Sequence, residues 1–168
     1  MFAASLRRRP RAFSLVEIMV AITIIGILAS LALPAFKKIV LQSRGSALLN
    51  DLRVFAGGYA QYAHSNGSYP ASYTTAGGFP ATMAGIITPA QWIRETPIGG
   101  YYAFLKDNTV GGTQYRALLQ VSTSGGSTIT FTAPDLLRLD QKSDDGDTAT
   151  GQFFTNGAAL NTYYVIEK

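Results

Sequence analysis

One apolar run in this sequence is long enough to cross a membrane, and a single ionisable side chain, Glu17, interrupts it. The run extends from Leu15 to Phe36, which is 22 residues. As an α-helix it would measure about 33 Å, slightly more than the ~30 Å hydrocarbon core of a bilayer. Four of the 12 residues before Phe13 are arginines. Basic residues favour the cytoplasmic side, so we expect a cytoplasmic N-terminus.

The apolar run has three ordinary interpretations. It could be a secretory signal peptide, with Ser30-Leu31-Ala32 as a small-x-small cleavage site and a mature terminus near Leu33. It could also be a plain single-pass anchor. A buried core helix is the least favoured, because the run is long and uniformly apolar. Hydropathy alone does not separate the first two interpretations.

Glu17 separates them, because a carboxylate inside a membrane costs about 2.5–3.5 kcal/mol near the centre and indicates a function. No Lys, Arg or His lies between Arg11 and Lys37 to pair with it. If the chain is cut after Ala12, however, Phe13 acquires a free α-amine, four residues or about 6 Å from Glu17 along a helix. The amine of a neighbouring copy could meet Glu17 directly. Such a pair would set the register between helices, as a lone polar group does in a coiled coil.

The segment from Arg11 to Glu17, followed by an unbroken apolar helix, resembles the prepilin cleavage and methylation motif of type IV pilins and type II secretion pseudopilins. The resemblance implies that a prepilin peptidase cuts between Ala12 and Phe13 and methylates the new amine. It also implies that Glu17 pairs with a neighbouring subunit's terminus during assembly. Pro34 matches the helix proline of the family, and a proline there predicts a kink.

Two positions depart from the usual family motif. Ala12 stands where Gly is commonest before the cut, and Ser14 stands where Thr is frequent. Both replacements are small side chains, so we still expect cleavage.

After Phe36 the pattern becomes amphipathic, with apolar residues spaced 7, 4, 3, 4 and 3 along one helical face. These residues are Leu41, Leu48, Leu52, Phe55, Tyr59 and Tyr62. Asn66-Gly67 and Pro70 predict the end of the helix. The whole helix would be about 75–80 Å long. A cleaved signal peptide has no need of such a continuation, whereas a helix half in the membrane and half packed on a small sheet is the pilin plan.

The C-terminal part predicts a small antiparallel sheet with loop and short-helix insertions. The expected strands are Tyr101–Leu105, Thr113–Val121, Thr128–Thr132 and Asn161–Ile166, and the expected short helices are Thr88–Arg94 and Pro134–Lys142. The expected fold class is therefore α+β, and the resemblance implies a pilin-like arrangement of the long helix on this sheet. The predicted organisation is a cleaved leader (1–12), a transmembrane polymerisation helix (13–36), its amphipathic continuation (37–66) and a globular sheet domain (67–168).

Three carboxylates, Asp144, Asp145 and Asp147, fall within four residues late in the predicted sheet domain. Their spacing is not that of an EF-hand. An acidic turn in solvent explains them, and so does a Ca²⁺ site. The resemblance favours calcium, because major pseudopilins of type II secretion carry a calcium loop late in the sheet domain. No other cofactor is expected.

These patterns indicate a structural filament subunit rather than an enzyme. The chain has no cysteine and one histidine, His64, with no nucleophile beside it. From Phe13 onward it carries ten basic and ten acidic side chains, so a nucleic-acid partner is not expected. The expected partners are copies of the chain, related pilin-like subunits, a prepilin peptidase and an inner-membrane assembly platform. The expected location is the bacterial inner membrane, with the globular domain in the periplasm.

Two alternatives to the filament subunit stay open at this point. One is an exported enzyme or binding protein with an ordinary signal sequence or anchor, which would need a functional site that the sequence does not offer. The other is a DNA-uptake pilin, which would need an exposed basic cluster.

Overall fold

The computed structural model describes residues 14–156 and 161–168, and the longest element is helix α1, Leu15–Asn66. The predicted end of this helix at Asn66 is confirmed. The chain divides into two compact units, one ending at Val40 and one from Leu41 to Lys168.

In the first unit, α1 exposes its large apolar side chains all around the helix, including Leu15, Ile25 and Phe36. Among the described residues, only this helix is long and apolar enough to cross a membrane, judged by length and composition. The helix continues through Pro34, so the kink expected there stays a prediction. The hydroxyl side chains of the stretch, Thr23 and Ser30, bond within their own helix by donating to backbone carbonyls of the preceding turn.

In the second unit, four strands form one antiparallel sheet in the order β1-β2-β4-β3. Their bounds are β1 Tyr101–Val110, β2 Thr113–Ser122, β3 Phe153–Asn156 and β4 Asn161–Glu167. β1 and β2 join through Gly111-Gly112, both with positive φ, as a two-residue hairpin turn requires. The short helices are α2, Pro89–Trp92, and α3, Ala133–Ser143, with single 3₁₀ turns at Ala81–Met83 and Ser124–Gly126.

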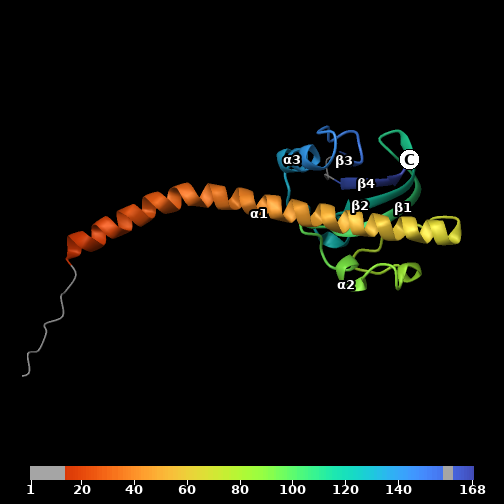
Figure 1. The fold of residues 1–168 in the computed structure, drawn as a ribbon, viewed down its shortest axis with the longest axis horizontal. Coiled ribbons are helices and arrows are strands. Elements are labelled where there is room, and N and C mark those ends of the chain that lie inside the picture. The colour runs from red at the N-terminus through yellow and green to blue at the C-terminus, as the bar shows by residue number, and fades with distance from the viewer. Residues whose placement is uncertain (1–13, 157–160) are drawn as a thin grey trace, which may run out of the picture. The chain divides into compact units, whose positions relative to one another are not determined.

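The core lies between the sheet and the amphipathic part of α1 (Figure 1). The predicted face of α1 is confirmed: Leu48, Leu52, Phe55 and Tyr59 are buried, and Leu41 and Tyr62 pack against the core from its edge. Each fully buried side chain of this size stabilises the fold by about 1.5–3 kcal/mol. Aromatic rings make up much of the interface. Tyr59 stacks on Phe104 of β1 at a centroid distance of 3.9 Å, and Phe55 meets Trp92 edge-on at 5.1 Å.

One polar cluster crosses this interface. Asp51 of α1 is buried and accepts hydrogen bonds from Arg94, which follows α2, and from the Tyr102 hydroxyl of β1, both at 2.7 Å. Burial and the Asp51 carboxylate raise the pKa of Tyr102. The cluster therefore joins α1, the α2 segment and the sheet through one oxygen of the Asp51 carboxylate.

The expected strand Thr128–Thr132 is wrong. This segment is extended, but its backbone bonds to the loop before β1 rather than to a strand: Thr130 donates both its amide and its hydroxyl to the Ile98 carbonyl, at 2.7 and 2.8 Å. The alternation arises because Phe131 is buried in the core and Ile129 packs against it. Alternation of apolar and polar residues indicates that one face of an extended segment is buried. A strand of a sheet must also form backbone hydrogen bonds with a neighbouring strand.

The other predicted elements are confirmed in place, but β1 continues from its expected end at Leu105 to Val110, α2 is limited to Pro89–Trp92, and one strand was missed. Helices α2 and α3 and strands β1, β2 and β4 occur where they were expected. β3 was missed because it has only four residues and takes its place by pairing with β4.

The glycines of α1 permit close packing rather than merely weakening the helix. A Cβ added at Gly45 would lie 2.8 Å from Leu139 of α3, and one added at Gly58 would lie 2.5 Å from Ile87. Gly57, the neighbour of Gly58, has nothing within 4 Å of that position. Of these two adjacent glycines, Gly58 is therefore packed against a side chain and Gly57 faces open space.

We predict that Gly57→Ala raises the free energy of unfolding by about 0.5–1 kcal/mol, because alanine removes the cost of glycine in a helix. Gly58→Ala should lower it by about 1–2 kcal/mol, because the new methyl group collides with buried Ile87. Trp92, the only tryptophan, is buried, so its fluorescence during denaturation measures both variants. Changes of equal sign and size would contradict this packing.

Candidate functional site

Glu17 lies in the first turn of α1 and is exposed on an apolar stretch. Its Oε2 is 3.5 Å from the backbone nitrogen of Ser14, at the N-terminal end of the helix. A helix N-terminus carries a partial positive charge from unpaired N–H groups, so it favours an acid in the first turn. Ala12 and Phe13, the predicted cleavage and methylation residues, lie outside the described residues. Among the described residues, no cationic side chain pairs with Glu17.

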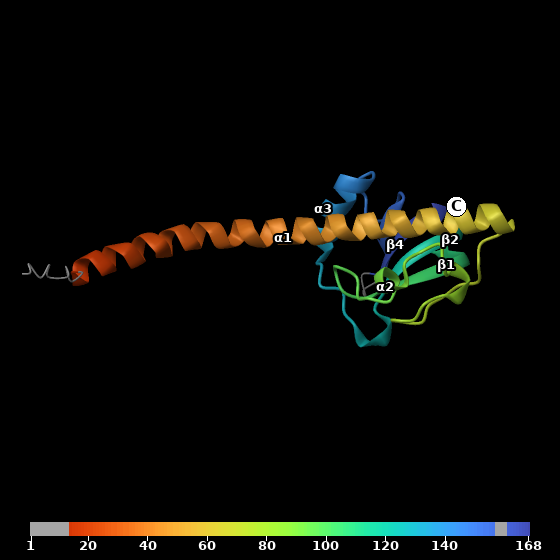
Figure 2. The same ribbon diagram turned by 60° about the horizontal axis from the view of Figure 1, so that its bottom comes forward.

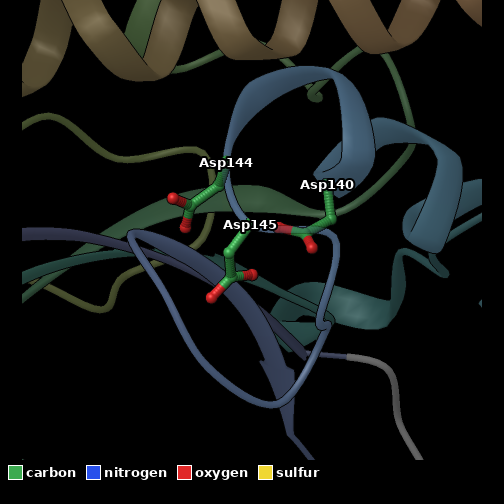
Figure 3. A group of neighbouring side chains, drawn as sticks. All are labelled: Asp140, Asp144 and Asp145. Atoms are coloured by element: carbon green, nitrogen blue, oxygen red, sulfur yellow. The ribbon is translucent and has the colours of Figure 1, made fainter.

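The carboxylates of Asp140, Asp144 and Asp145 converge at the end of α3 (Figure 3). One oxygen from each lies within 4.8 Å of those from the other two. Asp140 comes from the last turn of α3, and the other two come from the turn that follows it. The structure thus brings together two of the three predicted ligands and adds one, Asp140, that was missed.

Asp147, the third predicted ligand, is not part of this group. Its carboxylate accepts the amide hydrogen of Ala149 at 3.0 Å and so closes a local turn. Asp147 is the same residue type as Asp144 and Asp145 and lies in the same segment, so the sequence did not show that its carboxylate lies outside the group.

Asp140 is fully buried, and neither of its carboxylate oxygens has a hydrogen-bond partner of normal geometry among the described residues. Burial raises its pKa to about 6, and the charges of Asp145 and Asp144 contribute, while the nearby Gly146 amide offsets part of the shift. A buried, ionised carboxylate without a partner is costly and favours a bound cation or a proton. The i, i+4 spacing of Asp140 and Asp144 was visible in the sequence, but the burial was not.

The turn after α3 holds the other two carboxylates in place. Asp144 accepts the amide hydrogens of Gln152 and Phe153. Asp145 accepts from the Asp147 amide at 2.9 Å and from the Thr150 hydroxyl at 3.0 Å. These bonds leave lone pairs on each carboxylate free for a ligand, because an ionised carboxylate offers about four acceptor sites. The donor set is entirely oxygen, which suits a hard divalent cation such as Ca²⁺.

The remaining candidates are structural or solvent-exposed. Trp92 is buried in the core, and His64 is exposed near the end of α1. The hydroxyl–carboxylate hydrogen bonds of Thr132 with Asp135 and of Thr150 with Asp145 cap helix α3 and hold the turn that follows it.

The chain is similar to a family model and to three known proteins. A family model described as a prokaryotic N-terminal methylation motif matches residues 7–33. Type II secretion system core protein G of Klebsiella pneumoniae is 33% identical over 104 residues, covering 62% of this chain and 71% of that protein. The core protein G of Pseudomonas aeruginosa is 27% identical over 129 residues, covering 72% of this chain and 91% of that protein.

A fimbrial protein, EcpC of Eikenella corrodens, is 38% identical over 80 residues, which are 48% of this chain. The match spans about half of that relative, 52% of its length. No solved structure matches the chain. The relatives are named for filaments and for secretion, and the motif shared with the family model contains Phe13 and Glu17.

We predict that, without a bound cation, the free energy of unfolding falls as pH rises from about 4 to 6. The ordinary pKa of an aspartate is about 3.9, and in the folded chain the pKa of Asp140 is about 6. Across this window the folded state binds more protons, so raising the pH destabilises it, and the loss levels off about one pH unit above the folded pKa of about 6. The size is on the order of 2 kcal/mol.

Asp140→Asn should remove most of this fall, whereas Asp107→Asn, an exposed control, should leave it unchanged. Denaturation in a chelator between pH 4 and 7 measures all three proteins. A pH dependence in Asp140→Asn parallel to that of the original chain would contradict the assignment.

Proposed function

The chain belongs to the type IV pilin-like family, and we propose that it is a structural filament subunit, cut after Ala12 and assembled through helix α1. The observation that carries this proposal is Glu17, the single ionisable side chain on the exposed apolar stretch of α1. An isolated carboxylate in such surroundings needs a cation that the stretch itself does not contain. The identity to the secretion core protein G favours a type II secretion pseudopilus over a pilus.

The proposed mechanism has three steps. The arginine-rich leader holds the precursor with its N-terminus in the cytoplasm. Prepilin peptidase then cuts after Ala12 and methylates the Phe13 amine. Finally, the amine of one subunit pairs with Glu17 of a neighbour while the apolar helices bundle at the inner-membrane assembly platform. A charge pair in these low-dielectric surroundings is strong, and leaving either partner alone is costly.

The location follows from the same steps. The apolar stretch of α1 anchors the precursor in the inner membrane, and the orientation set by the leader places the globular domain in the periplasm. The alternatives of a signal-peptide-bearing enzyme or binding protein are not favoured, because the described residues offer no catalytic constellation. A DNA-uptake role is not favoured either, because the chain from Phe13 onward is formally neutral.

We predict that protein made with an active prepilin peptidase begins at N-methylated Phe13. Mass spectrometry of the N-terminal peptide measures this. A terminus near Leu33 would indicate an ordinary secreted protein instead.

Glu17→Gln, which keeps the shape and removes the charge, should be processed normally but lower filament yield at least about tenfold, because breaking a buried ion pair costs several kcal/mol. Thr23→Val is the matched control. It also removes a polar group from the apolar stretch, but one that bonds only within its own helix. Normal filaments from Glu17→Gln would refute the pairing.

A second role, binding of Ca²⁺, is favoured by the buried and unpartnered carboxylate of Asp140. In this proposal Asp140, Asp144 and Asp145 hold the ion, which offsets their mutual repulsion and joins the end of α3 to the turn before β3. Asp147 has no ligand role. The ion thus acts as a structural staple for the C-terminal part of the domain.

We predict that millimolar Ca²⁺ raises the melting temperature of the chain, because a ligand that binds only the folded state stabilises it by about 2.7 kcal/mol at 100 times its dissociation constant. Asp140→Asn should abolish the shift, and Asp147→Asn should retain it. Thermal unfolding with Ca²⁺, Mg²⁺ or a chelator measures this. Loss of the shift only in Asp147→Asn would contradict the ligand set.

A further inference from the structure

A cavity of about 210 Å³ lies beside α1 on the side of α3. It is lined by Ser46, Leu49 and Arg53 of α1 and by Lys142 of α3. Leu49 is buried, while the three polar residues are exposed. The Lys142 ammonium donates a hydrogen bond to the Ser46 hydroxyl at 2.9 Å. Two cations and one hydroxyl therefore line a single recess.

Neither cation of the cavity has a carboxylate partner among the described residues. The ion pairs within this part of the chain join other residues: Arg94–Asp51, Arg116–Glu167 and Arg138–Asp135. Lys142 uses one of its three donors on Ser46, and Arg53 has five donors in a planar fork. Because Ser46 accepts from Lys142, its own hydrogen remains available. The cavity thus presents mainly donors, and the arginine fork matches a carboxylate.

Two exposed acids outside the apolar stretch, Glu95 and Asp107, have no hydrogen bond or ion pair among the described residues. Glu95 directly follows Arg94, whose guanidinium bonds to Asp51, so the backbone of Glu95 lies within about one arginine side chain of Asp51 along α1. The cavity residues 46–53 span this same level, about 10 Å of helix. Asp107 lies farther along, three residues beyond Phe104, which stacks on Tyr59. By position along the helix, Glu95 is the acid that corresponds to the cavity.

The cavity and the Arg94–Asp51 ion pair, which directly precedes Glu95 in the chain, lie on opposite flanks of α1. Asp51 and Arg53 are two residues apart, which places them about 200° apart around the helix. In both views α2 and α3 lie on opposite sides of α1 (Figures 1 and 2). One copy therefore cannot place its own Glu95 in its own cavity. When two copies lie side by side, Glu95 of one copy can enter the cavity of the other. Each copy then still has either its cavity or its Glu95 available for a further copy.

We propose that the Glu95 carboxylate of one copy docks into the cavity formed by Ser46, Arg53 and Lys142 of the next copy. The contact joins two different surfaces, so it repeats along an open assembly instead of closing in a symmetric dimer. This proposal rests on the proposed filament function and adds a lateral contact between globular domains. It requires no residue of the apolar stretch.

Charge reversal in the full chain tests the contact. Arg53→Glu and Glu95→Arg should each lower filament yield about tenfold, because like charges then face each other across the contact, and the double variant should recover most of that yield. Asp107→Arg makes the same charge change at the other unpaired acid and should leave the yield unchanged. Failure of the double variant to recover, or an equal loss in Asp107→Arg, would overturn the proposal. Loss in Arg53→Glu alone would mean that the cavity takes another anion, and would also overturn it.

Cysteine pairs give an independent readout, because the chain has no native cysteine. Oxidised filaments of the Ser46→Cys/Glu95→Cys variant should give a ladder of multimers, since each copy carries both halves of the contact. Each single variant and the Ser46→Cys/Asp107→Cys control should give none. A product limited to dimers, or no product in intact filaments, would overturn the contact. These small exchanges keep the test valid even where a charge reversal prevents folding, which Trp92 fluorescence detects.

The two proposals fail in different ways. Filaments with N-methylated Phe13 that tolerate every charge reversal would leave the filament function standing and remove the Glu95 contact alone. Absence of filaments and of processing at Phe13 in the original chain would remove both.

Discussion

The structure of the globular unit depends on the burial of one face of α1 against the sheet. Leu48, Leu52, Phe55 and Tyr59 lie along that face at helical spacing and are almost inaccessible to water. Gly45 and Gly58 flank it and allow α3 and the Ile87 segment to approach the helix closely. Because this one helix supplies so much of the core, every other element is positioned relative to it, and a side chain's angle around α1 decides which neighbour it meets.

The three acids argued to matter most share one physical situation, since each lies in surroundings that disfavour an unpaired charge. Asp51 has its partners within the chain and joins α1 to the sheet. Asp140 has no partner within the described chain, which favours a cation. Glu17 stands on an apolar helix and is proposed to find its partner on a second copy. The source of the compensating charge therefore differs among the three acids. It lies within the chain for the structural Asp51, on a bound cation for Asp140, and on a second copy for Glu17.

Local sequence patterns predicted where helices and strands lie more reliably than they predicted which segments pair with one another. The apolar spacing located the buried face of α1, because helical periodicity depends on neighbours in sequence. The segment Thr128–Thr132 alternates as a strand does, yet it lies against the loop at Ile98 and pairs with no strand. β3 carries a weak pattern and is a strand only because β4 lies beside it. Strand pairing is a long-range property, and alternation does not encode it.

The sequence by itself determined the membrane-length helix, the isolated Glu17 within it, and the motif around Phe13, because length, charge and spacing are all local quantities. It also placed an acidic turn after the last short helix, but it named Asp147 where the structure groups Asp140 with Asp144 and Asp145. Only the tertiary structure decided which carboxylate is buried and which cations line a common cavity. Burial and convergence are set by packing between segments far apart in the chain, and residue type and spacing do not record them.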